Sequence, residues 1–301
     1  MVSDAMQSVI DGFRARKAAR ATEPPPPLDE FRATFAPGGR VFPLPDGVQA
    51  EPVELGGVPA TWLRPPGASG DRVVLYVHGG GFQAGDLRSH GELAARLGAA
   101  AAAVALLPEY RLAPEHTYPA AVEDVDAVWR ALRASGAPAA SIALAGDSAG
   151  GGLALALAVR LRDAGEDLPA ALLLLSPMLD MSASGESVVG REERDVIFTA
   201  DAVRATGAAY AGDADVRDPR VSPAFAELAG LPPLLVQVGT EETLFSDGAD
   251  VVERATAAGV DATLEVGEGL PHAYQTVADA PEAIAATDRG GSFLRDRFGR
   301  G

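Results

Sequence analysis

The chain has 301 residues, of which 47% are hydrophobic, and a formal net charge of −17 at pH 7. The acidic balance argues against nucleic acid and anionic membranes as partners, because both are bound by basic patches. The absence of cysteine excludes disulfides, thiolate catalysis and cysteine-ligated metals. Lys17 is the only lysine, so the core has none for a Ser–Lys dyad, a Schiff base or a Walker motif.

The length and apolar content favour one large α/β domain over residues 1–301. The first residues contain no apolar leader, and no stretch reaches transmembrane length. We therefore expect a cytoplasmic protein without stable membrane insertion.

Residues 1–21 carry apolar side chains at helical spacing and basic residues towards the end, which predicts an amphipathic helix. Four prolines at 24–27 end it, and a short helix is expected over 28–35. Such an arm covers apolar surface. A lid over an active site and simple packing on the core are both consistent with it.

Strands and helices alternate through the rest of the chain. Residues 48–64 predict two antiparallel strands around the turn at Gly56 and Gly57. Further strands are expected at 72–77, 101–107, 141–145, 170–175, 234–238 and 262–266, and helices at 87–98, 119–134, 149–164, 246–258 and 280–298. The pattern predicts a mostly parallel sheet of about eight strands with helices on both faces.

Residues 180–223 interrupt this alternation with polar and charged sequence and a helical stretch at 201–211. A late insertion of this kind is expected to lie over the strand tips, where ligands bind. We interpret it, together with residues 1–45, as a cap and not as an independent domain.

A strand turns into a helix at the motif G-x-S-x-G, with Ser148 at its centre. The turn holds the serine in a strained conformation, and Gly146 and Gly150 remove the clash with the crossing chain. Ser148 is therefore the candidate nucleophile, exposed at the N-terminus of the following helix.

A serine nucleophile requires a base, and the chain has four histidines. His78 belongs to a glycine loop, His90 is expected at the surface, and His116 is expected to be structural in a proline-bounded loop. His272 alone follows the last strand and satisfies the order serine, acid, histidine. The four histidines are scattered without ligand spacing, so no metal site is expected.

The acid should follow the strand at 234–238, where Glu241, Glu242 and Asp247 are candidates that spacing alone does not separate.

Oxyanion donors are expected from the run His78-Gly79-Gly80-Gly81, which directly follows a strand. The backbone N–H groups of Gly80, Gly81 and Ala149 would point at a developing oxyanion. The run lacks the spacing and the lysine of phosphate-binding loops.

The sequence resembles the hormone-sensitive-lipase family of α/β-hydrolases, which includes bacterial carboxylesterases. The resemblance rests on five motifs in the family's order: H-G-G-G-F at 78–82, E-Y-R-L-A-P-E-H at 109–116, G-D-S-A-G-G at 146–151, S-P-M-L-D at 176–180 and P-H-A-Y at 271–274. It implies an α/β-hydrolase fold, Ser148 as nucleophile and His272 as base. It further implies an oxyanion hole from Gly80, Gly81 and Ala149, in a loop shaped by His78 and Gly79.

The acid position departs from the family, which often has D-P-L-R-D-E-G there. This chain has E-T-L-F-S-D-G at 242–248, so the resemblance places the acid at Glu242. Glu241 remains a weaker alternative, and Asp247 is expected to cap the following helix.

The resemblance implies a cofactor-independent carboxylesterase for short- to medium-chain acyl esters, acting as a monomer or homodimer on small molecules. Phe82 and Phe198 are expected to line its apolar pocket. A lactone hydrolase or a natural-product deacylase would use the same chemistry. A non-catalytic receptor is a remote alternative, because the plant gibberellin receptor, which resembles this family, lacks the triad histidine that His272 supplies here.

Overall fold

An eight-stranded sheet in the order β1-β2-β4-β3-β5-β6-β7-β8 runs through the computed structural model, which describes residues 2–20, 22 and 26–299. Strands β1 and β2 pair antiparallel with each other, β2 pairs antiparallel with β4, and every other pairing is parallel. The strands are β1 (Gln49–Leu55), β2 (Val58–Arg64), β3 (Ser69–Val77), β4 (Ala103–Pro108), β5 (Ile142–Asp147), β6 (Leu172–Leu175), β7 (Leu234–Gly239) and β8 (Ala262–Gly267). The predicted α/β-hydrolase sheet is thereby confirmed.

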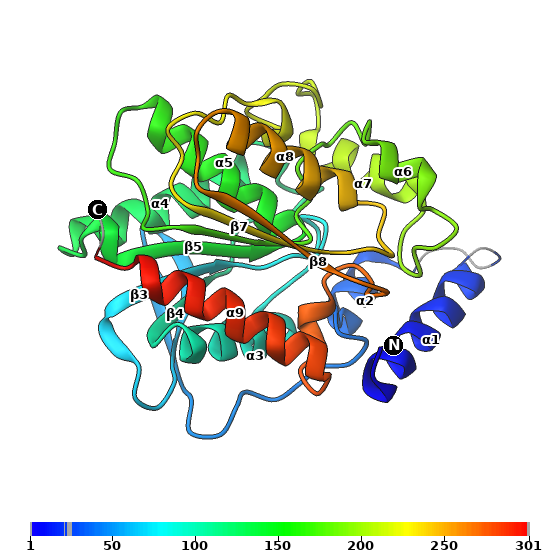
Figure 1. Ribbon diagram of the computed structural model, residues 1–301, viewed down its shortest axis with the longest axis horizontal. Helices are drawn as coiled ribbons and strands as arrows, with labels where there is room; N and C mark the ends of the chain where they lie inside the picture. Colours follow the sequence, from blue (N-terminus) through cyan, green and yellow to red (C-terminus); the bar gives the residue numbers. More distant parts are fainter. Residues whose placement is uncertain (1, 21, 23–25, 300–301) are drawn as a thin grey trace.

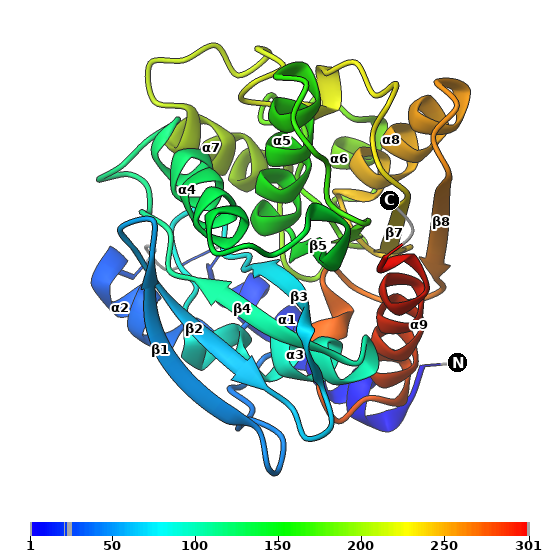
Figure 2. The same ribbon diagram turned by 90° about the vertical axis from the view of Figure 1, so that its left-hand side faces the viewer.

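Helices cover both faces of the sheet (Figure 1). Figure 2 shows α4, α5 and α8 on one side and α3 and α9 on the other. The helices are α1 (Asp4–Arg20), α2 (Leu28–Thr34), α3 (Leu87–Ala100), α4 (Ala120–Ala134), α5 (Ala149–Asp163), α6 (Glu186–Gly190), α7 (Ala200–Ala211), α8 (Phe245–Ala257) and α9 (Pro281–Arg297).

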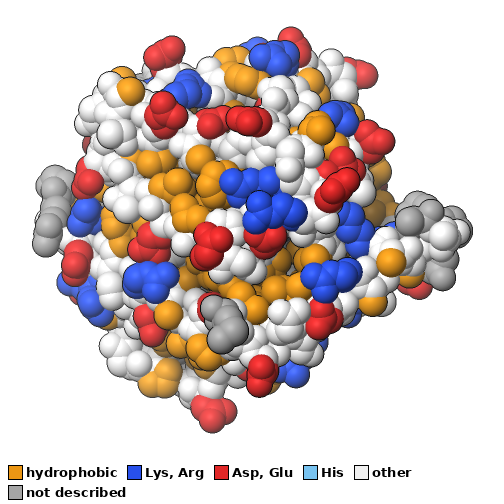
Figure 3. All heavy atoms as spheres, turned by 45° about the vertical axis from the view of Figure 1, so that its right-hand side comes forward, with side chains coloured by type: hydrophobic (Ala, Val, Ile, Leu, Met, Phe, Trp, Pro, Cys, Tyr) orange, Lys and Arg blue, Asp and Glu red, His pale blue; other side chains and the backbone are white. Residues whose placement is uncertain are grey.

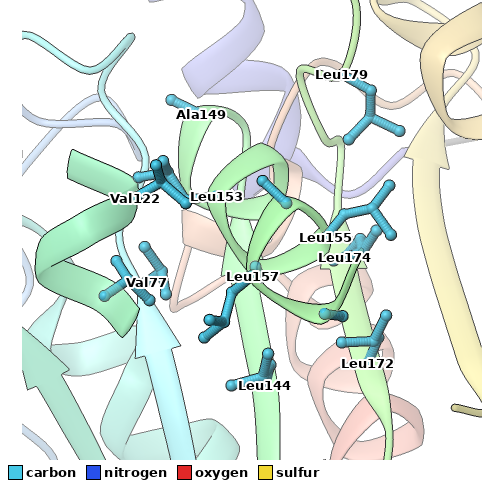
Figure 4. Close-up of a cluster of buried hydrophobic side chains, with 14 of the residues drawn as sticks. Val77, Val122, Leu144, Ala149, Leu153, Leu155, Leu157, Leu172, Leu174 and Leu179 are labelled. Atoms are coloured by element: carbon cyan, nitrogen blue, oxygen red, sulfur yellow. The ribbon is translucent and has the colours of Figure 1, made fainter. Parts of the chain in front are cut away.

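Alternate side chains of each central strand enter two different cores, as the two-residue period of a strand requires. Leu144 of β5 and Leu172 and Leu174 of β6 join the core beneath α5, whereas Ala143 and Leu173 join the core beneath α3 and α9. Figure 4 shows the first core, where α5 contributes Ala149, Leu153, Leu155 and Leu157. This packing fixes the start of α5, and with it the residue that precedes the helix.

The N-terminal segment and the insertion lie beyond the carboxyl ends of the parallel strands, on the right of Figure 1. Met6 and Ile10 of α1 form a third core with Val196 of the insertion and with Leu270 and Tyr274 after β8. The insertion carries α6 as well as the predicted helix α7. The two segments are therefore packed on each other at the edge of the sheet where parallel α/β folds bind ligands.

Charged side chains of both signs are interspersed with apolar ones on the face shown in Figure 3. In the part of the chain that the structure describes, no helix has the length and apolarity needed to cross a membrane.

Candidate active site

Ser148 lies between β5 and α5 with φ 51° and ψ −121°, a strained conformation for a non-glycine residue. Its N–H donates to the Leu175 carbonyl over 2.8 Å, which ties the turn to β6. A Cβ atom at Gly150 would lie 2.0 Å from the Val77 carbonyl oxygen, and one at Gly146 would lie 2.6 Å from the Gly150 carbonyl carbon. The two glycines therefore allow the close crossing that the turn requires, as the motif predicted.

Glu242 and His272 meet although they follow different strands. Oε2 of Glu242 lies 2.6 Å from Nδ1 of His272, and both side chains are buried. The other carboxylate oxygen, Oε1, accepts from the Gly239 N–H over 2.7 Å and from the Ser176 hydroxyl over 2.9 Å. The three contacts fix the carboxylate at the Nδ1 edge of the imidazole.

Ser176 holds both members of this pair. Its hydroxyl donates to Glu242 and accepts from the N–H of Ala273, the residue after His272, over 2.9 Å. Ser176 is fully buried and has φ 45°. No role for Ser176 was predicted from the sequence, although this serine opens the motif S-P-M-L-D directly after β6 and so lies at the same strand edge as the other site residues.

The charge of His272 is set by opposing effects. Burial lowers its pKa, but the hydrogen bond and negative charge of Glu242, aided by Asp195 and Asp147, outweigh burial and raise the pKa above its usual 6.5. On another side, the Phe198 ring packs edge-on against the imidazole with centroids 5.0 Å apart. A histidine in this setting is oriented on Nδ1 and stabilised when it takes up a proton.

Ser148 and His272 both line a cavity of about 220 Å³. The Ser148 hydroxyl makes no hydrogen bond within residues 2–20, 22 and 26–299, so it is free towards this space. The structure brings the predicted nucleophile, base and acid to one edge of the sheet.

The glycine loop borders the same cavity at Gly80 and Gly81. Gly80 has φ 114°, and a Cβ atom there would lie 2.2 Å from the Ala84 carbonyl oxygen, so only glycine fits. Among the described residues, the N–H groups of Gly80, Gly81 and Ala149 have no acceptor. They are available as donors beside Ser148.

Behind the loop, Asp147 connects it to the serine turn. Its Oδ1 accepts from the Tyr76 hydroxyl over 2.7 Å and from the Gly79 N–H over 3.0 Å, while Nε2 of His90 lies 3.3 Å from Oδ2. Burial alone would raise the Asp147 pKa, but His90 and these donors lower it to about 2. The carboxylate is thus ionised at neutral pH and holds Gly79 next to Ser148.

The prediction that His90 is a surface residue was wrong. Its side chain is fully buried, and its ring lies 5.5 Å from that of His78. Burial and the nearby His90 lower the His78 pKa to about 4, so His78 stays neutral while its Nδ1 contacts the Gly79 carbonyl over 2.9 Å. His116 is exposed in its loop.

The two other acid candidates lie elsewhere. Glu241 forms an ion pair with Arg194 and accepts a hydrogen bond from the Thr240 hydroxyl. Asp247 is not the helix cap that we predicted: it lies within the first turn of α8, fully buried, and its Oδ2 accepts from the N–H groups of Leu179 and Asp180 over 2.6 and 2.9 Å. Desolvation raises the Asp247 pKa to about 7.

Phe198 lines the cavity, but Phe82 does not. With φ 60°, Phe82 turns away and stacks on Tyr210, with ring centroids 3.8 Å apart. The apolar lining comes from the N-terminal segment, from the insertion and from the loops that follow β6 and β7. These residues are Phe13, Phe31, Phe35, Met178, Val196, Ile197, Phe198, Val203 and Leu244. Within the described ranges, no three histidine, aspartate or glutamate side chains are grouped as metal ligands.

Comparisons with known proteins identify the fold and the family of this chain. Residues 74–276 match a family of the α/β-hydrolase fold. An acetyl-hydrolase of Streptomyces hygroscopicus is 41% identical over 250 residues, which cover 83% of each chain. Among solved structures, an esterase of the bacterial hormone-sensitive lipase family superposes with a TM-score of 0.91 at 42% identity, covering 99% of this chain and 100% of that one.

A second solved structure, that of EstE5 soaked with p-nitrophenyl butyrate, has a TM-score of 0.91 at 36% identity and covers 98% of this chain and 99% of that one. The layered sheet, the serine turn and these similarities define an α/β-hydrolase. Within that fold, the chain belongs to the hormone-sensitive lipase family.

Proposed function

We propose that this chain, a carboxylic ester hydrolase, cleaves short- to medium-chain acyl esters with Ser148 as nucleophile, His272 as base and Glu242 as orienting acid. One observation carries the proposal. His272, whose Nδ1 lies 2.6 Å from Oε2 of the buried Glu242, borders the same cavity as the strained Ser148.

In the first half-reaction, Nε2 of His272 takes the Ser148 proton as Oγ attacks the ester carbonyl carbon. Glu242 keeps the Nδ1 proton in place and stabilises the imidazolium. The tetrahedral intermediate collapses as His272 gives its proton to the departing alcohol. Water then attacks the acyl-serine by the same route and releases the acid and Ser148.

The negative charge of each intermediate develops on the former carbonyl oxygen. The N–H groups of Gly80, Gly81 and Ala149 are proposed to bind it, since they are free and lie beside Ser148. Loss of a single donor of this kind costs about 10²- to 10³-fold in kcat in a well-studied protease. No cofactor is needed for this chemistry.

The size of the cavity supports a short acyl chain. We propose that residues 1–45 and 180–223 form a cap, because side chains from both border the 220 Å³ space above Ser148. Additional methylene groups gain binding energy only while apolar surface remains to bury them. We expect kcat/KM to peak at about C4 to C8 acyl length. The soak of the similar EstE5 with p-nitrophenyl butyrate, a C4 ester, supports this range.

A chain-length series of p-nitrophenyl esters and of lactones, measured on the wild type and Ser148→Ala, tests the proposal. Ser148→Ala removes the nucleophile and opens almost no cavity, and triad deletions cost on the order of a millionfold in kcat in a well-studied protease. More than a few per cent of residual activity in Ser148→Ala would contradict the serine mechanism. Lactone turnover above that of every linear ester would favour the lactone hydrolase instead.

A further inference from the structure

The loop of residues 192–198, here called the clamp loop, is held from two sides. It belongs to the insertion and carries Val196, Ile197 and Phe198 into the cavity wall. Phe198, its last residue, packs against the ring of His272. Whatever holds this loop therefore affects both the shape of the cavity and the surroundings of the base.

The outer attachment comes from the N-terminal helix. Nζ of Lys17 on α1 donates to the backbone carbonyl oxygens of Glu192, Asp195 and Phe198 over 2.8, 2.5 and 2.7 Å. Three acceptors around one nitrogen suit an ammonium group, whose three N–H bonds diverge, and do not suit a planar guanidinium. The chain has 25 lysine and arginine residues, and Lys17 is the only lysine among them.

The inner attachment comes from Asp195, which is buried within the loop itself. Its Oδ1 accepts from the N–H groups of Ile197 and Phe198 over 2.7 and 2.9 Å. Its Oδ2 accepts from the N–H and the hydroxyl of Thr243 over 2.8 and 2.9 Å. Thr243 directly follows Glu242, so one carboxylate spans the clamp loop and the loop of the acid.

We propose that Lys17 and Asp195 are positioning residues for ester hydrolysis, with Lys17 fixing the cavity wall for acyl-chain selection and Asp195 fixing the clamp loop to the catalytic acid. The kinetic effects expected from these two roles rest on the proposed function. The attachment of the loop itself is independent of that function and is measured separately.

The first experiment compares Lys17→Met with wild type by hydrogen–deuterium exchange. Loss of three charge-assisted hydrogen bonds is expected to speed exchange in residues 192–198 by about tenfold or more, with an intermediate effect in Lys17→Arg. Arg14→Met is the matched control, because Arg14 is an exposed cation on the same helix that pairs with Asp11 and does not border the cavity. Unchanged exchange in Lys17→Met, or equal acceleration in Arg14→Met, would overturn the outer attachment.

The second experiment separates binding from chemistry with p-nitrophenyl esters. Lys17→Met is expected to raise KM for the butyrate by about three- to tenfold, leave kcat within about twofold, and flatten the chain-length preference. An unchanged preference would overturn the selection role. If Lys17→Met does not fold, the same split is read from Lys17→Arg, which keeps the charge but not the three-way geometry.

Asp195→Asn tests the inner attachment, because Oδ1 is retained while an amide N–H group faces the Thr243 N–H. We expect kcat to fall by about tenfold with KM little changed. Asp195 is one of three carboxylates that raise the His272 pKa, and Glu242 and Asp147 are the other two. Removing the Asp195 charge should lower the His272 pKa and so move the acidic limb of the kcat/KM profile to lower pH. A change in KM alone would overturn this role. Failure of Ser148→Ala to lose activity would instead refute the proposed function while leaving the exchange result intact.

Discussion

Ser176 connects Glu242 to the backbone beside His272. Its hydroxyl donates to the Glu242 carboxylate and accepts from the N–H of Ala273, the residue that follows His272. Because this serine lies after β6, the carboxyl ends of β6, β7 and β8 all contribute to one buried polar cluster. The arrangement leaves Nε2 of the imidazole as the ring atom available to Ser148.

Ser176→Ala is expected to lower kcat by about tenfold while changing KM little, because Glu242 loses one of its donors and Ala273 loses its acceptor. Steady-state kinetics on p-nitrophenyl butyrate measures the change. The control is Ser222→Ala, since Ser222 is also a buried serine with two side-chain hydrogen bonds, but both of its partners, Met181 and Val216, belong to the insertion. Equal losses in the two variants would show that general destabilisation is responsible.

The identity of the acid is tested by two neighbouring substitutions. Glu242→Gln is expected to reduce kcat severely, towards the 10⁴-fold loss known for the corresponding change in a protease, because the histidine loses its orienting charge. Glu241→Gln should have a mild effect, because its ion pair with Arg194 is partly exposed and such pairs contribute about 0–1 kcal/mol. The reverse ranking of the two variants would refute the assignment of Glu242.

The pH profile follows from the protonation of His272, which must be neutral to accept the Ser148 proton. Because the His272 pKa is raised above 6.5, kcat/KM should rise with pH and reach half its plateau above pH 6.5. In Glu242→Gln, the rise of the residual activity with pH should occur at lower pH, since the Glu242 carboxylate that raises the His272 pKa is gone. A wild-type limb at or below the pKa of free histidine would contradict the environment described for His272.

Asp247→Asn is expected to stabilise the fold at neutral and alkaline pH. The folded-state pKa of Asp247, about 7, lies above the unfolded value near 3.8, so wild-type stability is lost as pH rises between these values. The amide oxygen of asparagine can accept from Leu179 and Asp180 without a buried charge. Thermal unfolding should show a difference between the variant and wild type that is small at pH 4 and grows to about 2–4 kcal/mol by pH 8. A difference independent of pH would refute this titration.

The sequence was sufficient for the features that depend on local order. The strands follow from hydrophobic runs, and Ser148, the acid candidates and His272 each follow a strand at the edge where parallel strands place ligand-binding groups. Local order did not separate the acid candidates, and the choice of Glu242 came from the family resemblance. Ser176 and Asp195 could not be identified in this way, because their partners lie 97 and 48 residues away in the chain.

The wrong predictions have the same origin. His90 lies on the buried face of α3, at helical spacing from Leu93 and Leu97, and its ring faces Asp147 of another element there. Phe82 follows the glycine loop as expected, but its positive φ turns the ring towards Tyr210. In each case, a contact across the fold decided the orientation of the side chain.

The solitary lysine has a practical consequence for attaching this enzyme to a surface. Aldehyde supports capture enzymes through side-chain amines, and the chain offers one, at Lys17. Coupling there would consume the nitrogen that bonds three backbone carbonyls and would place the support beside the cavity. The 42 carboxylate side chains provide attachment points on many other parts of the molecule, so carbodiimide coupling to an amine support should retain more activity.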